Sequence, residues 1–284
     1  MAKPLHLGFL YAPQSGHQTH AESFDPLNPL DLTAFARDLE GAGYAFLLID
    51  DSVGRAEDVR SEAFTTASFL ATRTRRIGLI AAANTSYVEP YNVSRLAASL
   101  DHVTRGRAGW LASTGAADPA GANYGQAAFA PDVHYVRADE ILEIARRLWD
   151  SWEDEALIAD PLSGLYADTD RIHAINHVGD HFSVRGPLNT PRIPQGRPVY
   201  VQAGSSEDGR SFAARHAEAI FTAHQTYEHA AAFYSDIKHR VAAAGRNPEH
   251  VLVLPGLSPY LGSTEAEARA LQDELNDLTQ PDYS

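Results

Sequence analysis

The stretch Gly196-Arg-Pro-Val-Tyr-Val-Gln-Ala-Gly-Ser-Ser-Glu-Asp-Gly209 contains, in order, an apolar strand, a glycine-serine turn and the start of a helix. Backbone N–H groups at a helix start have no partner within the helix, and the helix dipole favours negative charge there. With hydroxyls from Ser205 and Ser206 over the turn, the stretch has the sequence form of a phosphate cradle. Serine is also the ordinary N-cap of helices in α/β proteins, so a purely structural interpretation stands beside it.

Short apolar strands alternate with amphipathic helices along the chain, a pattern typical of a parallel sheet covered by helices. The pattern predicts strands at residues 5–11, 45–49, 77–83, 108–113, 198–203, 219–222 and 251–255. Seven strand-helix units are one short of the eight that close a (β/α)8 barrel.

The length of 284 residues and the hydrophobic content of 44% predict a single domain that spans residues 1–284. Residues 153–197 are rich in Asp, Pro and Gly and lack helical periodicity, which predicts a long loop insertion. Loops of this length usually carry function or disorder.

The net charge of -14 opposes binding to nucleic acid or to an anionic membrane, so a small molecule is the expected ligand. The chain has no cysteine, which excludes disulfides, thiolate metal sites and a cysteine nucleophile. No secretory signal or membrane span is recognised, and a cytoplasmic protein is expected.

Several common chemistries lack their motifs. The sequence has no Gly-x-Ser-x-Gly elbow, no P-loop and no Gly-x-Gly-x-x-Gly after a strand. The histidine pairs His17/His20 and His173/His177 have no third ligand at useful spacing, so no metal site is expected.

Five segments, in this order and at these separations, resemble the flavin-dependent monooxygenases of the bacterial luciferase-like superfamily, specifically the nitrilotriacetate and dibenzothiophene-sulfone monooxygenase group. They are residues 77–91, 106–110, 135–140, 148–152 and 186–209. The resemblance implies an α/β (β/α)8 TIM barrel of luciferase-like type. Members of that family continue well beyond residue 284, so the chain is expected to lack the last strand and helix and to be truncated at its C-terminus.

The resemblance also implies an activity. FMN lies across the carboxyl ends of the strands, and a separate NAD(P)H:flavin reductase supplies it as FMNH2. The enzyme then inserts one oxygen atom from O2 into a small organic substrate through a flavin C4a-hydroperoxide. A homo-oligomer is expected on the same ground.

The family's flavin contacts are carried over by motif, one residue at a time. The resemblance implies flavin contacts from Asp51 and Thr85, with Asp50 and Asn84 as adjacent second choices. It further implies a flavin or phosphate contact from Tyr135, and it implies that Ser206 is the phosphate ligand, with the adjacent Ser205 as the alternative. Each residue also has a structural interpretation, since an Asp at a strand end forms turns and a Tyr at a helix entrance packs its ring.

Three histidines near the expected catalytic rim are candidates for proton transfer, because histidine titrates near neutral pH. They are His17, His20 and His134. Exposed loop histidines without a catalytic role are also common, and this alternative stays open.

The chain departs from the family pattern at two positions. Pro131 stands where the family has a histidine, and Leu111 stands where it has an asparagine. These departures leave two alternatives open, a non-catalytic flavin-binding barrel remnant and a deazaflavin-dependent oxidoreductase. The substrate does not follow from the sequence.

Overall fold

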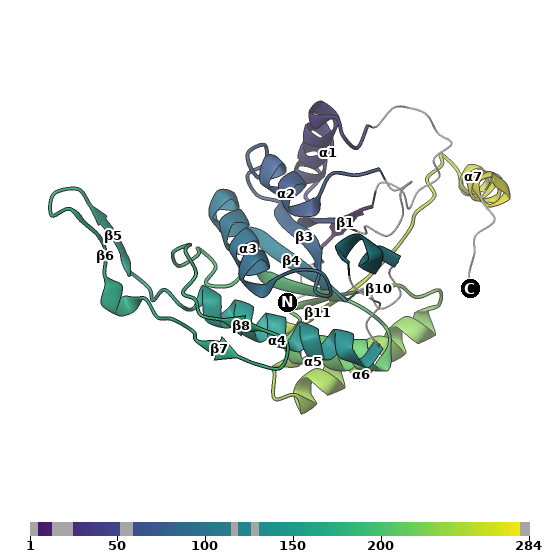
Figure 1. Ribbon diagram of the computed structural model, residues 1–284. Helices are drawn as coiled ribbons and strands as arrows, with labels where there is room; N and C mark the ends of the chain where they lie inside the picture. Colours follow the sequence, from purple (N-terminus) through teal and green to yellow (C-terminus); the bar gives the residue numbers. More distant parts are fainter. Residues whose placement is uncertain (1–4, 13–24, 52–58, 115–118, 126–130, 279–284) are drawn as a thin grey trace.

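The computed structural model describes residues 5–12, 25–51, 59–114, 119–125 and 131–278 of the chain (Figure 1). Within them, seven strands form one curled sheet in which every neighbouring pair is parallel. Their order is β1 (Gly8–Tyr11), β2 (Phe46–Ile49), β3 (Gly78–Asn84), β4 (Ala108–Ser113), β9 (Val199–Ala203), β10 (Ala219–Thr222) and β11 (Leu252–Pro255). All seven predicted strands are present, and an α/β fold with seven strand-helix units, one short of a closed (β/α)8 barrel, is confirmed for the described residues.

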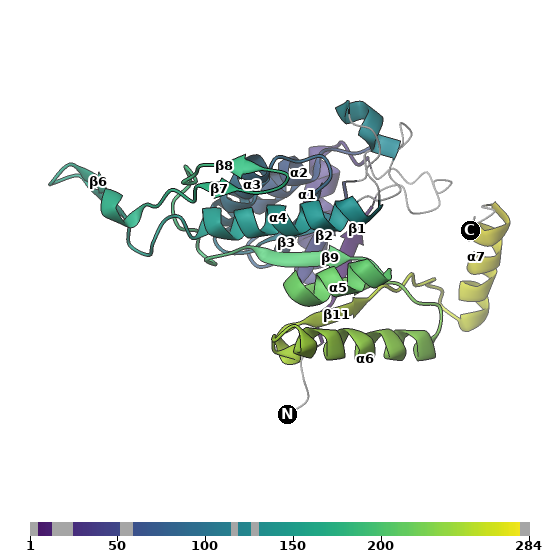
Figure 2. The same cartoon turned by 60° about the horizontal axis from the view of Figure 1, so that its bottom comes forward.

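Helices follow the strands of the sheet. They are α1 (Pro29–Gly41), α2 (Ala63–Ala71), α3 (Pro90–Thr104), α4 (Pro131–Trp149), α5 (Glu207–His216), α6 (Tyr227–Ala243) and α7 (Glu265–Leu278). Helices α1 to α6 pack around the sheet, whereas α7 lies away from it in both views (Figures 1 and 2). Of the helices that the structure describes, none has the length and apolar character needed to cross a membrane.

Two apolar clusters pack against the two faces of the sheet, because successive side chains of a strand point to opposite faces. The larger cluster lies between sheet and helices around Trp110, which is fully buried and makes edge contacts with Trp149 and Tyr200 at ring-centroid distances of 6.5 and 6.0 Å. The smaller cluster contains Leu111, the next residue along β4, with Leu48 and other strand residues. This smaller cluster covers the concave face of the curled sheet, the face without helices, which is therefore apolar.

The predicted loop insertion at 153–197 contains regular structure that its composition does not reveal. It forms two antiparallel hairpins, β5 (Leu157–Asp160) with β6 (Leu165–Ala167), and β7 (His177–Val178) with β8 (Ser183–Val184). The first hairpin extends away from the body of the molecule at the left of Figure 1.

The second hairpin is held to α4 by one carboxylate. Glu140 accepts hydrogen bonds from His177 Nε2 at 2.9 Å and from the backbone N–H groups of His181 and Phe182, each at 3.0 Å. His173 pairs with Glu153. Both histidines thus have local partners, and no group of three potential metal ligands occurs among the described residues.

Asp101 fixes the far end of the insertion to the sheet. Its side chain is fully buried at the end of α3 and accepts hydrogen bonds from the backbone N–H of Gln195 at 3.0 Å and from that of Ala108 at 3.3 Å. The side-chain amide of Gln195 donates to it as well, at 2.5 Å. One carboxylate therefore joins α3, the start of β4 and the approach to β9.

We expect Asp101→Asn to lower the free energy of unfolding by about 2 to 4 kcal/mol, because the amide keeps one acceptor oxygen and sets its NH2 group against at least one of the three buried donors. Chemical denaturation measures this loss. The exposed Asp38→Asn on α1 is the matched control and is expected to change stability by less than about 0.5 kcal/mol. Equal effects of the two substitutions would contradict the assignment.

Candidate functional site

Four neighbouring strands, β2, β3, β4 and β9, bring their carboxyl ends to one edge of the sheet. Asp51 follows β2, Asn84 ends β3, and Ser206 lies just after β9. Adjacent strands are about 4.8 Å apart, so three steps from β2 to β9 span roughly 14 Å. This edge is where α/β barrels place their active sites, and its width suits an elongated ligand.

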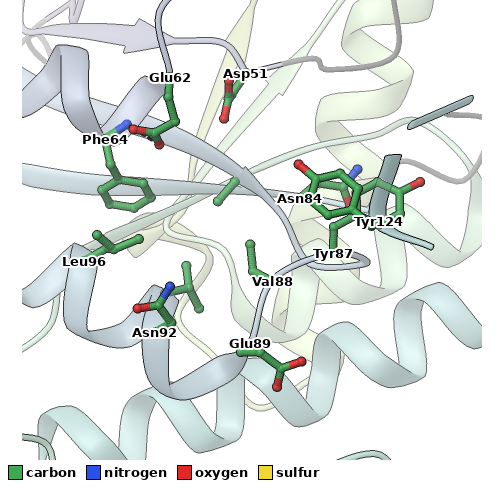
Figure 3. A pocket seen from close by; sticks show the side chains of 12 residues that line it. Asp51, Glu62, Phe64, Asn84, Tyr87, Val88, Glu89, Asn92, Leu96 and Tyr124 are labelled. Atoms are coloured by element: carbon green, nitrogen blue, oxygen red, sulfur yellow. Dashed lines mark hydrogen bonds between the residues drawn. The ribbon is translucent and has the colours of Figure 1, made fainter. Parts of the chain in front are cut away.

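A cavity of about 490 Å3 opens at the β2 and β3 end of this edge (Figure 3). Its polar lining comes from Asp51, Glu62, Asn84, Glu89 and Asn92. One wall is aromatic, since Tyr87 and Tyr124 stack in parallel with their ring centroids 4.6 Å apart.

Asp51 is the titratable group of this cavity whose pKa is strongly perturbed. Burial, followed by the nearby carboxylates of Glu62 and Asp50, raises the pKa of Asp51 to about 6. Arg60 opposes this effect but is paired with Asp50 at 2.6 Å. Near neutral pH a measurable fraction of Asp51 is therefore the acid, which can donate a hydrogen bond to a ligand.

The two residues at the end of β3 differ in their access to the cavity. Asn84 lines the cavity, and its side-chain oxygen accepts a hydrogen bond from the backbone N–H of Ser86 at 2.9 Å. Thr85 is fully buried, and its backbone N–H and hydroxyl both donate to the carbonyl of Ser113, at 2.8 and 3.0 Å. The hydroxyl of Thr85 thus joins β3 to β4, and its contact with a flavin stays a prediction.

His134 is buried beneath the same edge. Its Nδ1 lies 2.7 Å from the hydroxyl of Ser86, which donates to the carbonyl of Thr114 at 2.8 Å. Because Ser86 donates its hydroxyl hydrogen to Thr114, His134 takes the tautomer with a proton on Nδ1, which donates to the Ser86 oxygen. His17 and His20 lie outside the described residues.

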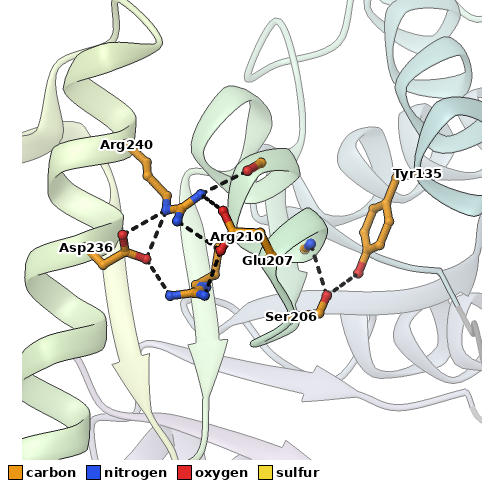
Figure 4. Close-up of polar contacts among 8 residues, drawn as sticks. Tyr135, Ser206, Glu207, Arg210, Asp236 and Arg240 are labelled. Carbon is orange, nitrogen blue, oxygen red and sulfur yellow. Dashed lines mark hydrogen bonds and ion pairs between the residues drawn. The ribbon is translucent and has the colours of Figure 1, made fainter. Parts of the chain in front are cut away.

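At the other end of the edge, the structure brings together two predicted residues from distant parts of the chain. The hydroxyl of Tyr135 lies 3.4 Å from the hydroxyl of Ser206 (Figure 4). Ser206 is the N-cap of α5 and accepts a hydrogen bond from the backbone N–H of Gly209 at 3.1 Å. A Cβ atom at Gly209 would lie only 2.8 Å from the Tyr135 hydroxyl, so glycine permits this approach. Ser205 is exposed beside them.

The first turn of α5 also carries two carboxylates, Glu207 and the exposed Asp208, and two arginines neutralise Glu207. Glu207 pairs with Arg210 at 2.9 Å and with Arg240 of α6 at 2.7 Å, and Asp236 bridges both arginines (Figure 4). Glu207 and Asp236 in turn raise the pKa of Arg240. The start of α5 thus combines hydroxyl donors, helix N–H groups and a compensated acidic charge, which fits a phosphate group.

Reasoning from the sequence missed several residues of this edge. Tyr87 lies within the segment 77–91 that carries the family resemblance, which is the one signal that favoured it. No sequence motif marks Glu62, Tyr124 or Arg240. Glu62 and Tyr124 belong to the site because they line the folded cavity, and Arg240 because it pairs with the distant Glu207.

The profile of the family described as luciferase-like monooxygenase matches residues 5–282. The chain belongs to the luciferase-like monooxygenase family. It is 48% identical over 240 residues to nitrilotriacetate monooxygenase component A of Aminobacter aminovorans, a match that covers 82% of this chain and 52% of that protein.

Two further relatives support the same family. The chain is 37% identical to dibenzothiophene-sulfone monooxygenase of Rhodococcus erythropolis, over 83% of its own length and 54% of the relative's. The crystal structure of a long-chain alkane monooxygenase superposes with a TM-score of 0.91 at 31% identity, covering 98% of this chain and 69% of that one. This family member thus spans about half the length of the two sequence relatives.

The raised pKa of Asp51 predicts a pH-dependent stability. Between about pH 4, where an unfolded Asp titrates, and pH 6, the folded protein binds more protons than the unfolded chain, so stability falls as pH rises and is then level. Asp51→Asn removes the titrating carboxyl group and with it this decrease in stability. We expect the variant to gain stability relative to the wild type from pH 4 to pH 6, and to keep that gain at pH 7 to 8.

Thermal unfolding across pH 4 to 8 measures the difference between variant and wild type. Asp38→Asn, which removes an exposed carboxylate of α1, again serves as the control. A constant difference for Asp51→Asn would show that Asp51 titrates normally.

Proposed function

We propose that the chain is the oxygenating component of a two-component, FMNH2-dependent monooxygenase, which takes FMNH2 from a separate NAD(P)H:flavin reductase and inserts one oxygen atom from O2 into a small organic substrate. The observation that carries the proposal is the meeting of the Tyr135 and Ser206 hydroxyls at the start of α5, on the sheet edge that also holds Asp51 and Asn84. The identity of 48% to nitrilotriacetate monooxygenase component A supports it.

The chain's own residues divide into two groups along the edge. Ser206, Tyr135 and the N–H groups of the first turn of α5 hold the phosphate. Asp51 and Asn84 face the ring end, where Asp51 donates or accepts a hydrogen bond according to its protonation. When bound, the reduced flavin supplies the electrons that activate O2. His134, His17 and His20 stay predicted candidates for proton transfer.

The two departures from the family pattern do not remove this edge. Leu111 is 5% exposed and packs on the concave face with Leu48 and Ile80, so it contributes to an apolar floor. Pro131 is the first residue of α4, a position that tolerates proline because its missing N–H would have no partner within the helix. Polar contact with the ring therefore comes from Asp51 and Asn84 in this proposal.

The cavity favours a neutral or cationic substrate. Three carboxylates, Asp51, Glu62 and Glu89, line it, and none of its described lining residues is basic. Arg192 and Arg197 of the insertion do not alter this charge, because both pair with Asp150 near the opposite edge of the sheet. A polyanionic substrate would meet like charges.

We expect Ser206→Ala to weaken FMNH2 binding about tenfold, because the phosphate loses one charge-assisted hydrogen bond. Binding of reduced riboflavin, which has no phosphate, is expected to stay unchanged. Anaerobic titration with each compound measures both affinities, and Ser99→Ala on α3 is the control. Equal losses for both compounds would assign Ser206 to the fold rather than to the phosphate.

Turnover separates an enzyme from a flavin-binding barrel without catalysis. With a flavin reductase, NADH, FMN and 18O2, we expect one labelled oxygen atom in the product of a neutral or cationic substrate from a chemically diverse panel. Tight FMNH2 binding without any incorporation of label across the panel would favour the non-catalytic alternative.

A further inference from the structure

A second cavity, of about 340 Å3, lies at the opposite edge of the sheet. Arg197 and Pro198 line it just before β9 begins, and Glu218 lines it just before β10 begins. The second half of α4 supplies Arg146 and Trp149. The cavity is thus at the amino ends of the strands, whereas the candidate flavin site is at their carboxyl ends.

This cavity concentrates positive charge in a chain whose net charge is -14. Four arginines line it, namely Arg146, Arg197, Arg215 and Arg246, and Glu218 is the one carboxylate among the described lining residues. Guanidinium groups gathered in a concave site favour an oxyanion, because their paired N–H donors match its oxygen atoms.

Three of the four arginines have partners within the protein. Arg197 and Arg215 pair with aspartates, and Arg246 donates to two backbone carbonyls at the end of α5 at 2.9 and 2.7 Å. For the half-buried Arg146, no hydrogen bond or ion pair of the guanidinium occurs within the part of the chain that the structure describes. Burial lowers the pKa of Arg146, and the charge of Arg197 lowers it further. Glu218 and Asp139 act on Arg146 only at a distance and raise its pKa, so its N–H donors stay available to a ligand.

Two other lining residues have buried polar atoms without partners. Tyr200 is 7% exposed, and its hydroxyl has no hydrogen bond among the described residues. The Nδ1 atom of His216 is also buried and unpaired there, while its Nε2 bonds to Asp139. Since a carboxylate accepts only, Nε2 carries the proton, and burial favours the neutral ring, so Nδ1 is an acceptor. Unpaired buried polar atoms are costly and call for a partner.

We propose that this basic cavity binds a phosphate group, either inorganic phosphate or the monoester of a small molecule. Arg146 and the Tyr200 hydroxyl are donors, and His216 Nδ1 is an acceptor. Monohydrogen phosphate and the monoanion of a monoester match both, because each carries acceptor oxygens and one phosphate O–H, whereas a simple carboxylate has no O–H to donate. The remaining volume and the wall of Trp149 leave space for a small organic group.

Titration calorimetry with inorganic phosphate at constant ionic strength tests the proposal, with sodium acetate as the comparison anion. We expect saturable binding of phosphate and none of acetate. Tyr200→Phe is expected to weaken phosphate binding about tenfold and Arg146→Gln at least as much. Without phosphate, the thermal midpoint of Tyr200→Phe is expected to stay level or rise, because the substitution removes a buried unpaired hydroxyl.

Two control variants distinguish this cavity from other places where phosphate could bind. Arg95→Gln changes an exposed arginine of α3 and is expected to keep phosphate binding. Ser206→Ala changes the cradle at the other edge, and the phosphate binding that this variant retains is expected to be lost on adding Tyr200→Phe. A second titration with glycerol 3-phosphate distinguishes the two possible ligands. If glycerol 3-phosphate binds more tightly than inorganic phosphate, the ligand is a monoester; if it binds more weakly, the ligand is free phosphate.

Three results would overturn the proposal. They are the absence of saturable phosphate binding, equal binding of acetate, and binding that Ser206→Ala abolishes while Tyr200→Phe leaves it intact.

Discussion

The pairing of β4 with β9 is the contact on which the Tyr135–Ser206 pair and the basic cavity depend, because it joins the two parts of the chain that the insertion separates. The register places Trp110 opposite Tyr200 and Leu111 opposite Val201. Gly109 permits the close approach, since a Cβ there would lie 2.8 Å from Ile80 and 3.1 Å from the carbonyl of Val199. Once these strands pair, the turn after β9 meets the start of α4 at one edge, and Tyr200 reaches the end of α4 at the other.

The opposite charges of the two edges follow from the direction of the helices. A helix that follows a parallel strand begins at the carboxyl edge and ends at the amino edge, so the positive ends of the helix dipoles gather at the first and the negative ends at the second. Glu62 accepts hydrogen bonds from two N–H groups of α2 at the carboxyl edge, and Arg246 donates to the last carbonyls of α5 at the amino edge. Arg146 has no such carbonyl among its described contacts.

Local patterns predict the sheet and one end of the candidate site. Each of the seven strands is an apolar run bounded by turn residues, and the glycine-serine turn predicts that Ser206 is the N-cap of a helix. The family resemblance, not the local pattern, connected it with Tyr135. What depends on long-range packing was not predictable, such as the hydrogen bond of Thr85 to Ser113 or the raised pKa of Asp51, which burial causes first and the neighbouring Glu62 second.

One buried ring connects the two edges. Phe212 of α5 is fully buried, and the ring of Tyr135 packs on it with centroids 5.5 Å apart. The same ring makes edge contacts with Tyr200 at 6.4 Å and with His216 at 5.0 Å. Because a close-packed interior leaves such a ring little room to shift, Phe212 fixes the hydroxyl of Tyr135 for the cradle and the hydroxyl of Tyr200 for the basic cavity. The phosphate positions proposed at the two edges are therefore set by the packing of a single side chain, although they lie at opposite ends of the strands.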